Sequence, residues 1–142
     1  MQSSRSEADP RGSDPLWPGP AGFAHRGLHY GAVIPENSLI AFAAALEAGA
    51  GIECDVRLTA DNHVLVFHDA DAWRMCASPM RIGSSRIADL ARLRLGDGPI
   101  PTLESLLAMV GGRVPLLLEV KMEKDAWRWV PALEKALAGY QG

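Results

Sequence analysis

The sequence predicts an α/β protein in which helices cover a largely parallel β-sheet. Two short segments, residues 64–67 and Leu116 to Leu118, are continuously apolar. Strands of parallel sheets are buried on both faces and therefore have continuous apolar runs of this kind. Between such runs, apolar residues recur at the three- and four-residue spacing of amphipathic helices.

The first predicted elements are a strand at residues 22–24 and the helix that follows it. Asn37 or Ser38 is placed to cap the helix, because both side chains can accept a hydrogen bond from a free amide of the first turn. Gly49 ends it. Its buried face is predicted to comprise Leu39, Phe42, Ala43 and Leu46.

Two strands follow, at residues 51–58 and 63–67, joined by a turn at residues 60–62. A parallel crossover needs a dozen or more residues, far more than this connection provides. The two strands therefore form either a local hairpin or one long, bent element.

The second half of the chain is predicted to contain three helices and one strand. A short helix spans residues 87–95, and Thr102 caps a second helix over residues 103–110 that Gly111 and Gly112 end. The strand spans residues 114–120. The last helix spans residues 125–138, in which Pro131 is tolerated only in the first turn or at a kink.

Length and composition indicate one globular domain. The chain has 142 residues, of which 48% are hydrophobic, enough for a sizeable core. Its net charge of −3 and the absence of a Lys/Arg cluster argue against nucleic acid as a partner. Residues 1–20, rich in Ser, Asp, Pro and Gly, are predicted to be a disordered lead-in that precedes the domain at residues 21–142.

The sequence favours a cytoplasmic location. It has no secretory signal, and no apolar segment approaches the ~20 residues that span a bilayer. Cys54 and Cys76 do not form a disulfide framework, and Cys54 is expected to be a buried thiol on the apolar face of its strand.

Polar residues stand where the predicted strands end, and these are the candidate site. Glu53 and Asp55 project to the same side of one strand. Two carboxylates this close repel each other by roughly 4 kcal/mol at an effective dielectric constant near 20, unless a cation or proton intervenes. In barrels of parallel strands, catalytic residues gather at these ends. The full set is His25, Arg26, Glu53, Asp55, His68, Glu119 and Lys121.

Each of these groups also has a purely structural interpretation. Asp69 could form an Asx-turn after His68, and Arg26 could be a solvated charge. Glu119 and Lys121 could form an exposed ion pair worth a fraction of a kcal/mol. The three leucines before Glu119 instead predict a buried strand, in which both charges need partners.

Together the residues suit metal-assisted cleavage of a phosphodiester. Three carboxylates without a thiolate favour Mg²⁺ or Ca²⁺. Arg26 and Lys121 match an anionic phosphate. Of the two histidines His25 and His68, one would activate the nucleophile and the other would protonate the leaving alkoxide.

The order of the motifs resembles that of glycerophosphodiester phosphodiesterases from about Gly22 to Lys121. The matching segments are Ala24-His25-Arg26-Gly27, Pro35-Glu36-Asn37-Ser38, Ala41-Phe42, Gly49, Ile52-Glu53-Cys54-Asp55-Val56, Thr59, Asp61, His68-Asp69, Ile100-Pro101-Thr102-Leu103 and Leu118-Glu119-Val120-Lys121. The resemblance implies a TIM-type (β/α) barrel and hydrolysis of glycerophosphodiesters to an alcohol and glycerol 3-phosphate.

The resemblance also implies a role for each site residue. His25 and His68 match the catalytic histidines of the family, and Arg26 and Lys121 match its phosphate-binding cations. The metal ligands correspond to Glu53, Asp55 and Glu119. Glu36 and Asn37 match an element that supports the loop beside the site and caps the helix.

The chain departs from the family in length and in one motif. Such barrels have eight strands and about 250 residues, whereas this chain corresponds to about the first four strands, the N-terminal half of the domain. Trp73-Arg74-Met75-Cys76 stands where the family has an arginine-threonine-glycine sequence, so leaving-group recognition does not follow from the resemblance.

A half barrel exposes sheet edges and an apolar inner face. Three alternatives follow: two copies complete a barrel as a homo-oligomer, the chain is a fragment, or it is an inactive remnant that binds metal, phosphate or partners. The same groups would also serve a related lipid phosphodiesterase, one that acts on lysophospholipids or that forms a cyclic phosphate through attack by a neighbouring hydroxyl in place of water.

Overall fold

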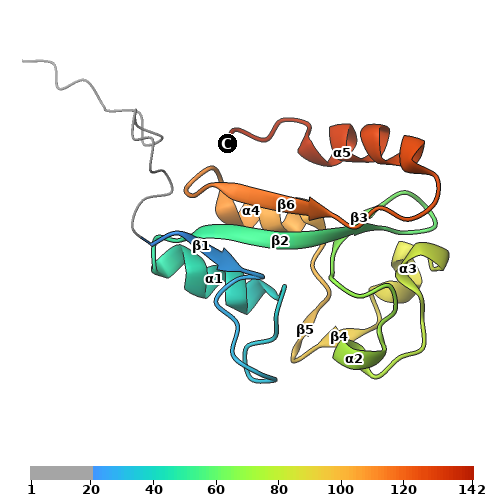
Figure 1. Cartoon of the computed structure of the whole chain (residues 1–142), viewed down its shortest axis with the longest axis horizontal. Helices are drawn as coiled ribbons and strands as arrows, with labels where there is room; N and C mark the ends of the chain where they lie inside the picture. Colours follow the sequence, from blue (N-terminus) through green and yellow to red (C-terminus); the bar gives the residue numbers. More distant parts are fainter. Residues whose placement is uncertain (1–20) are drawn as a thin grey trace, which may run out of the picture.

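A four-stranded sheet forms the centre of the fold (Figure 1). The structure is a computed structural model that describes residues 21–142; the predicted disordered lead-in, residues 1–20, lies outside the described residues. The central strand is β2 (Gly51–Leu58), which pairs in parallel with β1 (Phe23–His25) and with β6 (Leu116–Val120). This arrangement confirms the predicted α/β class.

The fourth strand, β3 (Val64–Val66), pairs antiparallel with the end of β2. Of the two alternatives for this connection, the local hairpin is therefore confirmed. Its turn is held by the Thr59 hydroxyl, which lies 2.8 Å from Asp61 Oδ1 and accepts from the His63 amide at 3.0 Å. β6 pairs with residues 52–56 of β2, a stretch that overlaps the residues of β2 paired with β1 and those paired with β3. β6 therefore occupies one edge of β2, and β1 and β3 lie one after the other along the opposite edge.

Helix α1 (Leu39–Glu47) begins at Ser38, whose hydroxyl accepts from the Ala41 amide at 3.2 Å. Ser38, the second of the two predicted caps, is thus the one used. Phe42 is fully buried as predicted, but Ala41 and Ala45 are the other residues that α1 buries completely. Their small side chains let the helix approach the sheet closely.

The remaining helices differ from the predicted ones mainly at their ends. Thr102 caps α4 (Leu103–Val110), and Gly111 ends it at a φ of 54°, as expected. The last helix, α5 (Trp129–Leu137), begins later than predicted because Asp125 has a φ of 61° and residues Ala126–Arg128 form a 3₁₀ turn (η2). Pro131 lies in the first turn of α5, where its missing amide costs nothing.

The prediction of a helix over residues 87–95 is wrong beyond Leu90. Helix α3 covers Ile87–Leu90 only, and β4 (Arg94–Leu95) then pairs with β5 (Gly98–Pro99). Leu90 and Leu95 are both buried in the same small cluster, yet residues five apart lie on different faces of a helix. The chain must leave the helix to bury both side chains.

Two short elements between β3 and α3 were not predicted. Helix α2 (Trp73–Cys76) and a 3₁₀ turn at Ile82–Ser84 (η1) follow the strand. Asp71 accepts from the Trp73 amide at 3.0 Å where α2 begins. α2 buries none of its residues completely.

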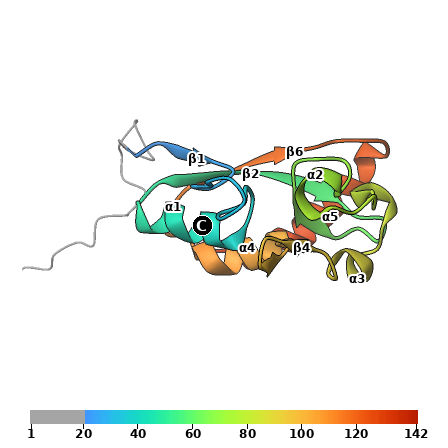
Figure 2. The same cartoon turned by 90° about the horizontal axis from the view of Figure 1, so that it is seen from below.

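Helices cover one face of the sheet and leave the other face open (Figure 2). The residues of β2 that point to the helices, Ile52, Cys54 and Val56, join α1, α4 and α5 in the main core. Cys54 is a buried free thiol, as predicted, and burial raises its pKa. On the opposite face, Phe23 and Leu117 are 43% and 53% exposed. The predicted exposed inner face is therefore present, but within residues 21–142 it is apolar only at these two residues.

Within residues 21–142, the structure contains no helix that combines the length and apolar character needed to cross a membrane.

Truncation of Phe42, the large buried side chain of α1, tests this description of the core. Phe42→Ala removes a fully buried ring and is expected to lower the free energy of unfolding by about 3–5 kcal/mol in a urea titration. Ile40→Ala, on the exposed side of the same helix, should change it by less than about 0.5 kcal/mol. Equal losses in the two variants would contradict this assignment of the buried face.

Candidate functional site

Three carboxylates from two neighbouring strands converge at the open face of the sheet. Glu53 and Asp55 lie on β2, and Glu119 lies beside Asp55 in the register of β6. One oxygen from each of the three side chains lies within 4.8 Å of the others. Oxygen ligands at this spacing can surround a hard divalent cation. The structure thus brings together the three predicted metal ligands.

Asp55 is the most deeply buried of these acids, at 1% exposure. Its Oδ2 accepts from Asn37 Nδ2 at 3.0 Å and lies 3.1 Å from Arg26 Nε. Its Oδ1 lies 3.3 Å from Lys121 Nζ. Arg26 Nε is buried and makes no hydrogen bond, so its contact with Asp55 is an ion pair without hydrogen-bond alignment. Two cations therefore compensate one buried negative charge.

The backbone around Arg26 is held in an uncommon conformation. Arg26 and Asn37 have φ angles of 57° and 54°, in the left-handed region that non-glycine residues rarely adopt. In this conformation the Arg26 amide donates to Glu53 Oε2 at 3.0 Å, and the Asn37 amide donates to the Arg26 carbonyl at 2.9 Å. Strain at such positions costs about 1–3 kcal/mol and is concentrated at functional sites.

Gly27 explains how α1 fits beneath this turn. Its φ is 77°, and a Cβ atom at this position would lie 2.8 Å from atoms of Ala41. Only glycine lets the turn and the helix pack this closely.

Glu119 and Lys121 form an ion pair, with 2.5 Å between Lys121 Nζ and Glu119 Oε1. This hydrogen bond is the main reason that the pKa of Lys121 is raised. The prediction that Glu119 is buried is wrong: its side chain is 56% exposed, because it lies on the face of β6 that no helix covers. Lys121 nevertheless links Glu119 to Asp55, so the pair is part of the site.

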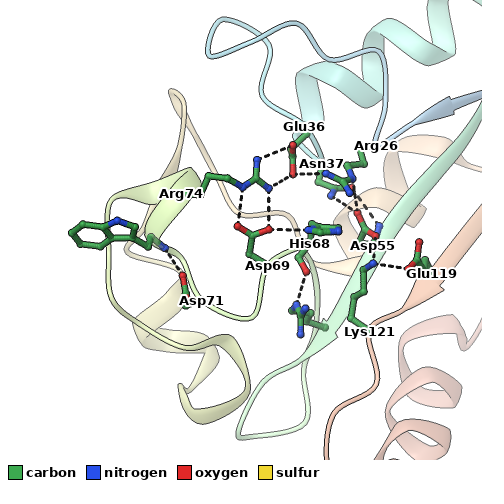
Figure 3. Close-up of polar contacts among 12 residues, drawn as sticks. Arg26, Glu36, Asn37, Asp55, His68, Asp69, Asp71, Arg74, Glu119 and Lys121 are labelled. Carbon is green, nitrogen blue, oxygen red and sulfur yellow. Dashed lines mark hydrogen bonds and ion pairs between the residues drawn. The ribbon is translucent and has the colours of Figure 1, made fainter.

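The two histidines have different carboxylate partners. His25 Nε2 lies 3.8 Å from Glu53 Oε2, and the His25 side chain is 67% exposed. His68 Nδ1 lies 2.8 Å from Asp69 Oδ1, and in Figure 3 the ring extends from Asp69 toward Asp55. A carboxylate beside Nδ1 favours the tautomer with its hydrogen on that nitrogen, which leaves Nε2 as an acceptor.

One arginine that the sequence did not assign to the site connects its two sides. Arg74 pairs with both Glu36 and Asp69 (Figure 3). The Arg74 guanidinium lowers the pKa of Asp69 to about 2 and holds the pKa of Glu36 below its usual value. Asp69 is therefore a partner of His68 and Arg74, and the turn-forming aspartate is Asp71.

A cavity of about 550 Å³ opens beside Lys121. Cationic side chains dominate its polar lining: Arg57, Arg81, Lys121, Lys124 and Arg128. Arg57 donates to the His68 carbonyl at 2.7 Å and to Glu123 at 2.8 Å. Its position two residues after Asp55, on the same face of β2, was the sequence signal that could have identified it. The signal for Arg74 was its place in the segment that stands where the family has an arginine-threonine-glycine sequence.

Residues 25–137 match the Glycerophosphoryl diester phosphodiesterase family. A glycerophosphodiester phosphodiesterase from Bacillus altitudinis is 33% identical over 80% of this chain and 49% of its own length. The chain spans about half the length of that relative.

Solved structures show the same similarity. A glycerophosphodiester phosphodiesterase from Thermotoga maritima has a TM-score of 0.70 and 33% identity, over 85% of this chain and 50% of that one. A phosphodiesterase from Oleispira antarctica, in complex with the product sn-glycerol-3-phosphate, has a TM-score of 0.76 and 25% identity, over 87% and 53%.

These comparisons confirm both the fold and the resemblance. The neighbouring structures are TIM-type barrels, and the sheet with its parallel strands β1, β2 and β6 corresponds to part of such a barrel. The matched region contains all the residues that converge on Asp55. The chain belongs to the glycerophosphoryl diester phosphodiesterase family.

Proposed function

We propose that this chain carries the metal and phosphate site of a phosphodiester hydrolase that releases an alcohol and glycerol 3-phosphate from glycerophosphodiesters. The observation that carries the proposal is the convergence of three carboxylates from β2 and β6 between the cations Arg26 and Lys121. Family membership and the glycerol 3-phosphate bound to the Oleispira antarctica relative support the substrate class.

Glu53, Asp55 and Glu119 would hold the divalent cation, Mg²⁺ or Ca²⁺. Their oxygen-only donor set and their spacing fit a hard ion. When bound, such an ion acts as a Lewis acid toward a non-bridging phosphate oxygen. It also relieves the mutual repulsion of the three acids.

The other residues would bind the phosphate and move protons. Arg26 and Lys121, already beside the carboxylates, are placed to contact phosphate oxygens. Of His25 and His68, one acts as the general base and the other as the general acid. Glu36 and Asn37 support the site by holding Arg26 and Asp55.

Residues 21–142 would then form the amino-terminal half of the catalytic domain. The chain matches about half of its relatives, with the parallel strands delivering their carboxyl ends to the site. Two free cysteines support a reducing compartment such as the cytoplasm.

Removal of one metal ligand tests the proposed reaction. Glu53→Gln is expected to lower the rate of metal-dependent glycerol 3-phosphate release by about 100-fold or more. This is the loss of rate that typically follows removal of one catalytic group. His68→Ala should do the same. Rates are measured with glycerophosphodiesters in the presence of Mg²⁺ or Ca²⁺ and after chelation.

Glu47→Gln is the matched control, because it makes the same change at an exposed position of α1. It should leave the rate unchanged. Retained hydrolysis in Glu53→Gln or in His68→Ala would overturn the assignment of that residue.

Self-association is a second candidate function, favoured by the open inner face of the sheet. The Phe23 ring lies over Gly51, where a Cβ atom would be 2.8 Å from it, and Leu117 points to the same uncovered face. We propose that a second copy of the chain covers these residues. The partner would shield exposed apolar area beside the acids.

Sedimentation velocity tests this proposal. The wild-type chain is expected to sediment as a dimer that dissociates on dilution, and Leu117→Asn should shift the equilibrium toward monomer. Val130→Asn, an equally polar change at an exposed site on α5, should leave it unchanged. A monomer at every concentration would exclude self-association.

A further inference from the structure

Arg74 makes two forked contacts that lie outside the proposed metal site. Its Nε and Nη2 donate to the two carboxylate oxygens of Asp69 at 2.8 and 2.9 Å. Its Nη1 and Nη2 donate to the two oxygens of Glu36 at 3.1 and 2.7 Å. The planar guanidinium thus holds two carboxylates in fixed orientations at once.

These contacts complete a continuous chain of charges across the mouth of the site (Figure 3). Glu36 Oε1 also accepts from Arg26 Nη1 at 3.1 Å, and Asp69 Oδ1 also contacts His68 Nδ1 at 2.8 Å. The chain begins at the end of β1 and finishes after β3. Arg74 is the link that joins its two halves.

The surroundings of Arg74 argue against a mainly stabilising role. Its side chain is 49% exposed, and α2 has no fully buried residue. Arg74 restricts the rotation of the Asp69 side chain. A carboxylate held at both oxygens cannot turn away from His68.

We propose that Arg74 is a positioning residue that acts on His68 through Asp69. By fixing Asp69, it keeps the neutral imidazole in the tautomer with its hydrogen on Nδ1. Nε2 is then free to exchange a proton. The role of Nε2 in proton transfer during the reaction rests on the proposed function. The tautomeric state of His68 does not, because it is a property of the chain itself.

The depressed pKa of Asp69, about 2, is consistent with this role. Asp69 is ionised throughout the neutral range and remains an acceptor for the Nδ1 hydrogen.

The direct test is the tautomeric state of His68, read from long-range ¹H–¹⁵N correlation spectra of the ¹⁵N-labelled chain. The spectra are recorded at a pH above which the ring nitrogen shifts of His68 no longer change, and the spectrum of the His68→Asn chain identifies the signals of His68. In the wild-type chain Nδ1 should resonate as the protonated nitrogen. In Arg74→Ala its shift should move toward the unprotonated range.

Two further variants sharpen this test. Arg74→Lys keeps the charge but loses the fork, so it should shift in the same direction as Arg74→Ala. Arg92→Ala removes an exposed arginine of the same region and should match the wild type. Backbone amide spectra verify that each variant is folded. An unchanged Nδ1 shift in both Arg74 variants would overturn the proposal.

Kinetics separate this proposal from the proposed function. Arg74→Ala should lower kcat about tenfold, part of the roughly 100-fold or more that a positioned acid or base contributes, with KM nearly unchanged. A raised KM with unchanged kcat would assign Arg74 to substrate binding and overturn the proposal. If the wild-type chain shows no hydrolysis, the proposed function fails, and the tautomer measurement still decides the role of Arg74.

Discussion

The site is organised around the buried carboxylate of Asp55. A buried charge without partners is costly, and removal of one partner from a buried ion pair typically costs 3–5 kcal/mol. Asp55 obtains its partners from three separate elements: Arg26 after β1, Lys121 after β6, and Asn37 before α1. Its charge can be compensated only when the parallel strands β1 and β6 flank β2 in the observed register. The topology of the sheet and the electrostatics of the site therefore depend on each other.

The backbone conformation beside the site follows from the same constraint. The left-handed turn at Arg26 directs its amide to Glu53 while its guanidinium reaches Asp55 and Glu36. Close packing of Gly27 against α1 holds this turn in place. The acids lie on strands β2 and β6, and the two cations directly follow β1 and β6. Regular elements therefore hold these groups in place, which is what a preorganised site requires.

The sequence predicted which side chains converge at the open face of the sheet better than it predicted the elements around them. Alternation along a strand placed Glu53 and Asp55 on one face, and apolar runs ending in charged residues identified His68 and Lys121. These signals are local, and the parallel sheet brings their residues together. The Arg74 contacts join residues 38 positions apart through the short helix α2, and no local pattern encodes them. Two other features depend on tertiary packing. Helix α3 ends early because Leu90 and Leu95 are buried in a second small core. Glu119 is exposed because no helix covers its face of the sheet.

In the proposed site, Glu53, Asp55 and Glu119 share one divalent ion. A crystal of the chain grown with Mn²⁺, whose anomalous scattering locates the metal, tests it most directly. We expect one strong anomalous peak within about 2.0–2.6 Å of an oxygen from each of the three carboxylates, the range for hard cations. A crystal in which the three side chains are ordered without a peak between them, or in which the metal binds elsewhere, would contradict it.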